Sequence, residues 1–299
     1  MSFPSNLIEF QDRFPDEESC WRYLREARWP DGFVCPRCGE PGSHFIQTRR
    51  LEQCRSCRYQ SSVTAGTVFH RTRVSLRLWF VGVFFVARHK NGISARQFQR
   101  DTGLGSYQTA WTMLHKIRAA LGLRTGEALS GLVEADEAYV GGPRPGIVGR
   151  GALNKSIVAV VVEQRAHTAG RLHLEVVPDI SWASLGPFVR GSINAPETTV
   201  RTDGCHSYSP LSSVGVDHHA VVGDPEALPW AHTVFGNLKT WLRGTFHGVS
   251  HKHLPRYLGE FRFRFNERWN ETELFPKVLV RALHTEPIPY HRLTAEAVG

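Results

Sequence analysis

Two pairs of cysteines constrain the fold of this chain more than any other feature. Cys35 and Cys38 form one CxxC turn, and Cys54 and Cys57 form a second one after fifteen intervening residues. Each turn can aim two thiolates at one ion, and two such turns complete the tetrahedron that zinc prefers. The spacing falls within the range typical of zinc sites. Because no coordination position is left open, we predict a structural zinc ion, with four reduced thiols as the alternative.

The net charge favours a polyanionic partner. The 299 residues include 36 Lys and Arg against 28 Asp and Glu, so the formal charge is +8 and the pI is near 9.4. Charge of this sign attracts nucleic acids. With 41% hydrophobic residues, the chain can also bury one large core or two to three smaller ones. We therefore expect a folded protein that binds a nucleic acid.

No segment of the sequence is suited to crossing a membrane. The longest apolar run, residues 76–87, contains an arginine and is far shorter than the roughly 20 residues that span a bilayer. It is typical of a core helix. The N-terminus has acidic residues where a signal peptide needs a basic start and an apolar run. We therefore expect the protein to stay in the cytoplasm, with no membrane partner.

The residue composition and the hydrophobic pattern change twice along the chain. Gly, Pro and the cysteine pairs dominate the first part, which is typical of a small β-rich metal module. Helical patterns follow, separated by Gly-containing turns. Strand-like runs come after Gly126. The predicted divisions are a zinc-ribbon domain over 1–74, a helical module over 75–126, an α/β domain over 127–285 and a tail over 286–299.

The helical module has the form of a helix-turn-helix. Residues 94–104 and 106–121 predict two helices joined by a short Gly-containing turn, and Ser106 is suited to cap the second one. In this form the second helix enters the major groove of DNA, with its N-terminal side chains on base edges. An ordinary helical hairpin is the alternative. The expected base-reading side chains are Tyr107, Gln108 and Thr109, and the expected phosphate contacts are Lys116 and Arg118.

The last domain has the pattern of a mixed sheet covered by helices. β-branched residues dominate its strand-like runs, and residues 181–193 predict a helix between the third and fourth runs. This order predicts an α/β fold. The Gly- and Arg-rich segment 141–155 is typical of a mobile hairpin loop, either an ordinary connection or a DNA contact. The predicted strands are 131–140, 156–164, 171–177, 197–204 and 216–222.

Two acids stand at informative places in this predicted sheet. Strand alternation puts Glu134 and Asp136 on one face of the first strand. An acid in the middle of a strand is costly to bury unless a cation meets it. Asp203 ends a later strand, and ligands and metals collect at strand ends of α/β sheets. Together the two aspartates indicate a cation site.

Several motifs in the same order resemble one protein family. The segments CPRC, CRSCRYQSSVTAGTVFH, VEADEAYVGG, TDGCHSY and NLKTWLRGTFHGVSHKHLPRYLGEFRFRFNERW are similar to those of zinc-ribbon insertion-sequence transposases of the ISXO-like, fifteen-ninety-five group. The resemblance runs from about residue 15 to 283. It implies a ribonuclease-H-like catalytic domain of the DDE type, which cuts and joins DNA at transposon ends with Mg²⁺ or Mn²⁺. Asp136 and Asp203 match the first two carboxylates of the family, and Lys239 matches its basic residue.

The third metal ligand departs from the usual acid. No Asp or Glu occurs between Glu226 and Glu260. On a helix His232, seven residues before Lys239, lies within about 20° of the same face, whereas Asn237 lies about 140° from His232. An imidazole favours Mn²⁺ more than a carboxylate does. We predict His232 as the third ligand if the helix starts near residue 230.

Other readings of this segment remain open. Asn237 is a candidate ligand through its amide oxygen. His232 could instead only contact a DNA phosphate or cap the helix. Asp224 or Glu226, in the loop before the helix, is a further candidate ligand. Lys239 and Arg243 are expected to contact the phosphates beside the scissile bond.

The resemblance implies a DNA transposase that binds the terminal inverted repeats of its element and acts on target DNA. Phosphodiester hydrolysis and strand transfer would use Asp136, Asp203, His232 and Lys239. The family also implies a homo-oligomer on DNA and a prokaryotic, nucleoid-associated protein. A catalytically inactive DNA-binding relative with the same fold is the main alternative. A metal-dependent nuclease is a third reading, but it would not need a zinc ribbon and a helix-turn-helix together.

Overall fold

Two separate cores divide the chain into two units. The computed structural model describes residues 4–122, 128–141, 155–224 and 227–295. Unit 1 comprises Met1–Leu121 and Asn270–Thr294, and unit 2 comprises Gly122–Trp269 and Ala295–Gly299. The zinc-ribbon region and the helical module thus share one unit, whereas the sequence predicted a boundary after residue 74. Residues 270–285 belong with them and not with the α/β domain to which the sequence assigned them.

An aromatic cluster forms the core of unit 1. It joins α1 (Leu7–Arg13), α2 (Glu17–Arg28), α3 (Leu76–Arg88) and α9 (Leu274–His284). The ring of Phe275 lies 5.9 Å from those of Phe10 and Phe14, and 5.7 Å from that of Phe80. All four side chains are almost fully buried. Aromatic rings bury large apolar areas, so α9 completes a core that the first ninety or so residues begin.

A three-stranded antiparallel sheet adjoins the predicted metal-binding cysteines, of which Cys54 ends β2 and the other three lie outside the strands. Its strands are β1 (Ser43–Ile46), β2 (Leu51–Cys54) and β3 (Gln60–Ser62), with the short helix η1 (Gln47–Arg49) after β1. Arg25 of α2 bonds to the buried Glu52 at 2.6 Å, which ties β2 to the helices of unit 1. The β-rich module predicted from the sequence is therefore confirmed.

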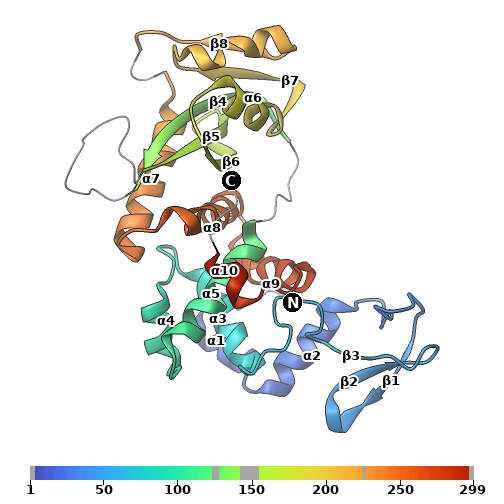
Figure 1. Cartoon of the computed structure of the whole chain (residues 1–299). Coiled ribbons are helices and arrows are strands. Elements are labelled where there is room, and N and C mark those ends of the chain that lie inside the picture. The colour runs from blue at the N-terminus through green and yellow to red at the C-terminus, as the bar shows by residue number, and fades with distance from the viewer. Residues whose placement is uncertain (1–3, 123–127, 142–154, 225–226, 296–299) are drawn as a thin grey trace. The chain divides into compact units, whose positions relative to one another are not determined.

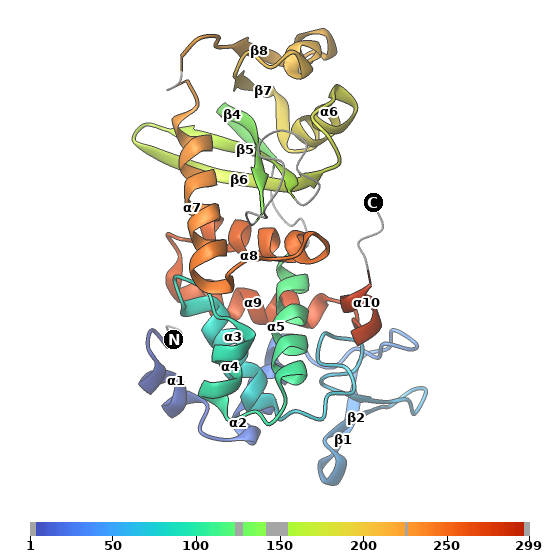
Figure 2. The same ribbon diagram turned by 60° about the vertical axis from the view of Figure 1, so that its left-hand side comes forward.

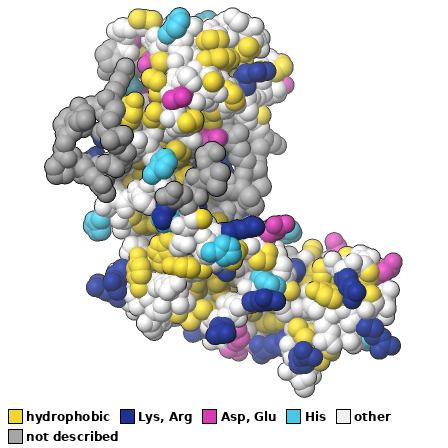
Figure 3. Space-filling view, in the orientation of Figure 1, with side chains coloured by type: hydrophobic (Ala, Val, Ile, Leu, Met, Phe, Trp, Pro, Cys, Tyr) yellow, Lys and Arg dark blue, Asp and Glu magenta, His cyan; other side chains and the backbone are white. Residues whose placement is uncertain are grey.

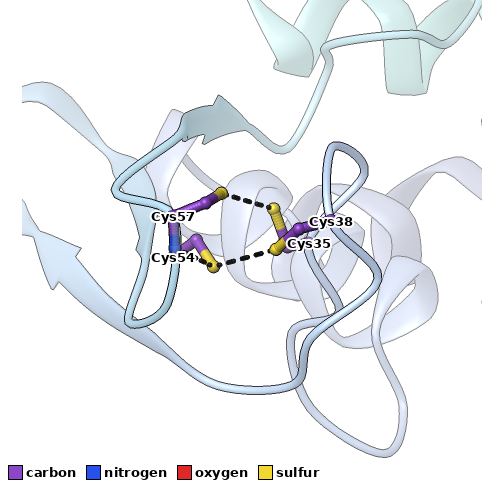
Figure 4. Close-up of side chains that lie close together, drawn as sticks. All are labelled: Cys35, Cys38, Cys54 and Cys57. Atoms are coloured by element: carbon purple, nitrogen blue, oxygen red, sulfur yellow. Dashed lines mark hydrogen bonds between the residues drawn. The ribbon is translucent and has the colours of Figure 1, made fainter.

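The four cysteine sulfurs converge on one point (Figure 4). Cys35 Sγ lies 3.6 Å from Cys57 Sγ, and Cys38 Sγ lies 3.6 Å from Cys54 Sγ. A tetrahedron with Zn–S bonds of 2.3 Å has edges of roughly 3.8 Å, so the spacing fits one zinc ion. The backbone N–H groups of Arg37 and Cys57 point at sulfurs of the set, at 3.4 Å each. The chemistry and the spacing support a structural zinc site.

The predicted helical module is present in unit 1 with its expected caps. Ser94 accepts a bond from Gln97 N at the start of α4 (Ala95–Thr102), which ends at Gly103 in the left-handed region at φ 67°. Ser106 Oγ accepts from Thr109 N at 3.3 Å and so caps α5 (Tyr107–Gly122), as predicted. The short helices η4 (Glu271–Glu273) and α10 (Tyr290–Thr294) complete this unit.

Unit 2 is built on a mixed five-stranded sheet in the order β6-β5-β4-β7-β8. β5 pairs antiparallel with β4 and β6, whereas β7 runs parallel to β4 and β8. Each predicted strand is present, and the predicted α/β class is confirmed. The strands are β4 (Leu129–Val140), β5 (Ser156–Arg165), β6 (Thr168–Val177), β7 (Ile193–Thr202) and β8 (Asp217–Ala220).

Helices cover both faces of this sheet (Figures 1 and 2). On one face, α7 (Pro229–Phe246) and α8 (Leu254–Asn266) pack on Val158, Val160 and Val162 of β5. On the other, α6 (Trp182–Arg190) and η2 (His206–Val214) pack on Ala159 and Val161. The short helix η3 (His251–His253) precedes α8. Because β5 is buried on both faces, it has a continuous apolar run instead of alternation.

Segment 142–154, most of the predicted hairpin loop, lies outside the described residues. Of the helices that the structure does describe, none is both long enough and apolar enough to span a bilayer.

We expect one zinc ion per chain, and we expect its removal to unfold the ribbon around residues 33–60. In a module this small, metal binding contributes on the order of 10 kcal/mol to folding. Cys54→Ser protein should lose bound zinc, measured by atomic absorption, while Cys205→Ser protein should retain it. Amide spectra that stay unchanged in the ribbon after chelation would contradict the prediction.

We expect Phe275→Ala to destabilise unit 1 by about 3–5 kcal/mol, because the change opens a cavity in the aromatic cluster. Denaturant unfolding followed by Trp fluorescence measures the loss. Val280→Ala is the matched control, since Val280 lies on the same helix with 40% of its surface exposed. Equal stabilities for the two variants would show that α9 is not part of the core.

Candidate active site

The central strand β4 brings the two predicted aspartates together. In the parallel ladder, Glu134 of β4 pairs with Arg201 of β7. The same register, continued by two residues, sets Asp136 level with Asp203, the first residue after β7. Asp203 contributes to raising the pKa of Asp136. Two carboxylates from neighbouring strands are thus near one another at the level where β7 ends.

The surroundings of Asp136 favour binding of a cation. Its side chain is 13% exposed, and burial is the main cause that raises its pKa. The charges of Asp203 and Glu134 raise the pKa further, whereas the N–H of Glu137 and the ring of His232 lower it. The charged form of a partly desolvated carboxylate near other acids is stabilised when a divalent cation binds beside it.

Asp203 lies in a tight turn at the end of β7. Its Oδ1 accepts a bond from Cys205 N at 3.0 Å, which fixes the side chain against its own backbone. The preceding Thr202 is buried and its hydroxyl lies 2.9 Å from His218 Nε2 of β8. Asp203 itself is exposed. The turn therefore presents one carboxylate at the rim of the sheet.

His232, which the helix count placed on the same face as Lys239, lies beside Asp136. Helix α7 begins at Pro229, so His232 is in its first turn. His232 Nε2 lies 3.7 Å from Asp136 Oδ2, too long for a hydrogen bond but short enough for a shared cation. The exposed Asn237 lies more than one helical turn further along α7. Asp224 is exposed in the preceding loop, and Glu226 lies outside the described residues.

The three predicted ligands do not converge as tightly as the cysteines do. Over the ranges that the structure describes, the four thiols are the one group of three or more His, Cys, Asp or Glu side chains arranged to hold a metal ion, and their sulfurs lie within 4.8 Å of one another. Asp136, Asp203 and His232 surround a wider space. Asp203 and His232 are exposed, so a cation in solvent can reach both side chains.

Two further acids of β4 hold the site from opposite faces of the sheet, and sequence reasoning gave neither a role. Glu134 is fully buried and accepts bonds from the backbone of α7. Glu137 points to the other face, where Tyr208 Oη donates to it at 2.8 Å. Tyr208 follows Asp203 in the TDGCHSY segment and is 1% exposed. The acids of the VEADE segment, which are divided between the two faces of a strand, were the sequence signal that could have pointed to these two residues.

Basic residues line a cleft along the second half of α7. The cleft has a volume of about 430 Å³, and Lys239, Arg243 and His247 contribute to its wall together with Tyr139 and Leu242. Lys239 Nζ also lies 5.9 Å from the centre of the Phe235 ring. His232, Lys239 and Arg243 therefore follow one another along α7, which places positive charge next to the acidic end of the sheet.

In unit 1, the first turn of α5 is exposed but its later basic residues are not. Tyr107 is 45% exposed and stacks under Arg96, and Gln108 is exposed as well. Thr109 is half-buried. Lys and Arg side chains are more numerous over unit 1 than over unit 2 on the face drawn in Figure 3. The surface at the start of α5 therefore fits the predicted DNA contact.

The positions of Arg118 and Lys116 differ from the predicted phosphate contacts. Arg118 is 1% exposed and donates to Ile93 O at 3.0 Å, so its guanidinium fills a place in the core. Lys116 is half-buried, with Nζ 3.5 Å from Val68 O. The two residues lie about 160° apart around α5, so they are covered because this helix packs against neighbours on more than one side, where long cationic stems bind carbonyl groups.

Comparisons with known proteins agree with this architecture. Residues 128–266 match the ISXO2-like transposase domain, and residues 15–60 match the transposase zinc-ribbon domain. The chain is also 27% identical over 280 residues to an uncharacterized protein in the transposable element ISH50 of Halobacterium salinarum, covering 84% of this chain and 91% of that one. The resemblance inferred from the motifs is confirmed: this chain joins a transposase zinc ribbon to an ISXO2-like transposase domain.

Proposed function

We propose that this protein is the DNA transposase of an insertion sequence. It binds the terminal inverted repeats of its element, hydrolyses phosphodiester bonds at the ends and joins them to target DNA. One observation carries the proposal. The β4–β7 register, continued by two residues from the Glu134–Arg201 pair, sets Asp136 level with Asp203, and Asp136 Oδ2 lies 3.7 Å from His232 Nε2. This grouping of two acids and a histidine around β4 supports the proposal.

The donor set fits a divalent cation of the Mg²⁺ or Mn²⁺ class. Asp136 and Asp203 offer hard oxygen donors, and His232 offers an imidazole, which favours Mn²⁺. When bound, such ions activate a water or a 3′-hydroxyl and stabilise the leaving oxygen of a phosphodiester. Asp136 would be the shared ligand, because it lies between Asp203 and His232. No covalent protein intermediate is needed, so no nucleophilic side chain is assigned.

The remaining residues bind and orient DNA. Lys239 and Arg243 hold the phosphates beside the scissile bond, where positive charge both positions the strand and stabilises the transition state. The exposed start of α5 supplies base contacts from Tyr107, Gln108 and Thr109. Two DNA ends must be joined in one reaction, so we expect a homo-oligomer on paired ends.

A catalytically inactive DNA-binding relative is the second candidate. One observation favours it: α7 carries no acid, and the ligand atoms of Asp136, Asp203 and His232 do not gather as closely as the four thiols do. Such a protein would bind the same DNA ends and cut neither strand. Cleavage assays with purified protein distinguish the two candidates directly.

We expect Asp136→Asn to reduce cleavage of end DNA to background while leaving DNA binding intact, because an amide cannot replace a shared carboxylate ligand. Labelled inverted-repeat DNA with Mg²⁺ or Mn²⁺ gives the cleavage rate, and a mobility shift gives the affinity. The control is Asp217→Asn, an exposed acid at the sheet edge that bonds Thr199. Cleavage by the Asp136 variant at the wild-type rate would refute the proposed site.

We expect His232→Ala to slow cleavage on the order of 10-fold to 100-fold through weaker metal binding, and Asn237→Ala to leave the rate unchanged. Both residues lie on exposed parts of α7, so both variants should fold. The slower rate of the His232 variant should recover partly at high Mn²⁺ concentration. The reverse ranking of the two variants would transfer the third-ligand role to Asn237.

A further inference from the structure

The helix that carries His232 lacks a cap of its own. Its N-cap residue is Leu228, which has no side-chain acceptor, and its first residue, Pro229, has no N–H. The N–H groups of Trp230 and Ala231 therefore need acceptors from elsewhere, because the first turn of a helix offers them none. Polar residues such as Ser or Asp fill this need in most helices.

Glu134 of β4 supplies both acceptor bonds. Its Oε2 accepts from Trp230 N at 2.9 Å and from Ala231 N at 2.8 Å. A carboxylate at this place also interacts favourably with the positive end of the helix dipole. The contact joins residues almost a hundred positions apart in the sequence, so it fixes where α7 starts on the sheet.

Burying the Glu134 carboxylate costs folding free energy, and packing alone gives no reason for an acid at this position. Glu134 is fully buried, and its second oxygen, Oε1, has no hydrogen-bond partner among the residues that the structure describes. A buried acid with an unpaired oxygen destabilises a fold, whereas an apolar side chain of similar size would fill the same volume. The two bonds to α7 give this carboxylate a specific use.

The geometry couples this contact to the candidate metal site. Glu134 and Asp136 are on the same face of β4, two residues apart, and Ala231 and His232 are adjacent in α7. The bond from Glu134 to Ala231 thus sets the neighbouring His232 next to Asp136, with Nε2 3.7 Å from Oδ2. A shift of the first turn by even one residue would rotate His232 away by about 100°.

We infer that Glu134 is a positioning residue of the active site, which clamps the first turn of α7 to β4 and so holds His232 against Asp136. The role of His232 as a ligand rests on the proposed function, whereas the clamp rests on the contacts alone. Helix α7 has no acidic residue of its own. The acid next to its first turn is Glu134 of β4, which binds the helix backbone and not a cation.

The experiment uses the full chain and two readouts, amide hydrogen exchange at Trp230 and Ala231 and Mn²⁺ affinity by calorimetry. Glu134→Ala should speed exchange at both amides on the order of tenfold or more, because the acceptor is lost. Mn²⁺ binding should weaken on the order of 10-fold to 100-fold, as it does when groups that orient metal ligands are removed. Glu134→Gln retains one acceptor oxygen and should fall between wild type and Glu134→Ala.

Glu163→Gln is the matched control. Glu163 is also a buried acid of this sheet, but it lies on β5, on the other face, and bonds Arg171 at 2.9 Å. Its loss should weaken the sheet without changing exchange at Trp230 and Ala231 or affinity for Mn²⁺. If the control reproduces both effects of the Glu134 variants, the effects come from general loosening of the sheet and the inference is overturned.

A double-mutant cycle separates positioning from simple stabilisation. In His232→Ala protein the clamp has no ligand to position, so adding Glu134→Ala should cause no further loss of Mn²⁺ affinity. Fully additive losses would overturn the inference, and so would unchanged exchange at both amides in a folded Glu134 variant. If Glu134→Ala does not fold, Glu134→Gln decides on the same readouts. A wild-type protein that neither binds Mn²⁺ nor cuts DNA defeats the proposed function, while the exchange data still test the clamp.

Discussion

The need to satisfy acids on a central strand organises unit 2. β4 lies between β5 and β7 and carries Glu134, Asp136 and Glu137 within four residues. Charged groups are costly away from water, so each needs a partner. Glu134 accepts hydrogen bonds from the first turn of α7, and Glu137 accepts one from the hydroxyl of Tyr208. The side chains on either side of Asp136 in β4 thus position α7 on one face of the sheet and η2 on the other. Asp136 itself faces His232 and Asp203.

Unit 1 is stabilised in a different way. Its small sheet has few apolar side chains to bury, with Phe33 as the main one beside the cysteines, so zinc bound by the four thiols would replace a hydrophobic core there. Its helices instead share the ring cluster around Phe14 and Phe275. The two parts are joined through Arg25 and Glu52, a bond that runs from α2 to β2. One unit thus contains a metal-dependent module fastened to a conventional core.

Local patterns in the sequence predicted most of the fold. The CxxC spacing, the β-branched runs and the Ser106 cap are short-range signals, and the structure contains what each predicts. The helix count from Lys239 also singled out His232, because seven residues nearly complete two turns, and in the structure this residue lies beside Asp136. Long-range contacts were not predictable in this way. The clamp from Glu134, the bond from Tyr208 to Glu137 and the burial of Arg118 each depend on which elements meet in space, and residues 270–285 carry no signal of the core that they join.

The return of α9 to unit 1 has a consequence for protein synthesis. Phe10, Phe14 and Phe80 leave the ribosome early, but the ring that completes their core belongs to Phe275, near the end of the chain. Domains usually fold in the order in which they emerge. Here the first unit has to wait while the whole of the second is translated. A chain that ends prematurely, before Phe275, therefore lacks the ring that completes the core of unit 1, even if Gly122–Trp269 of unit 2 has been made.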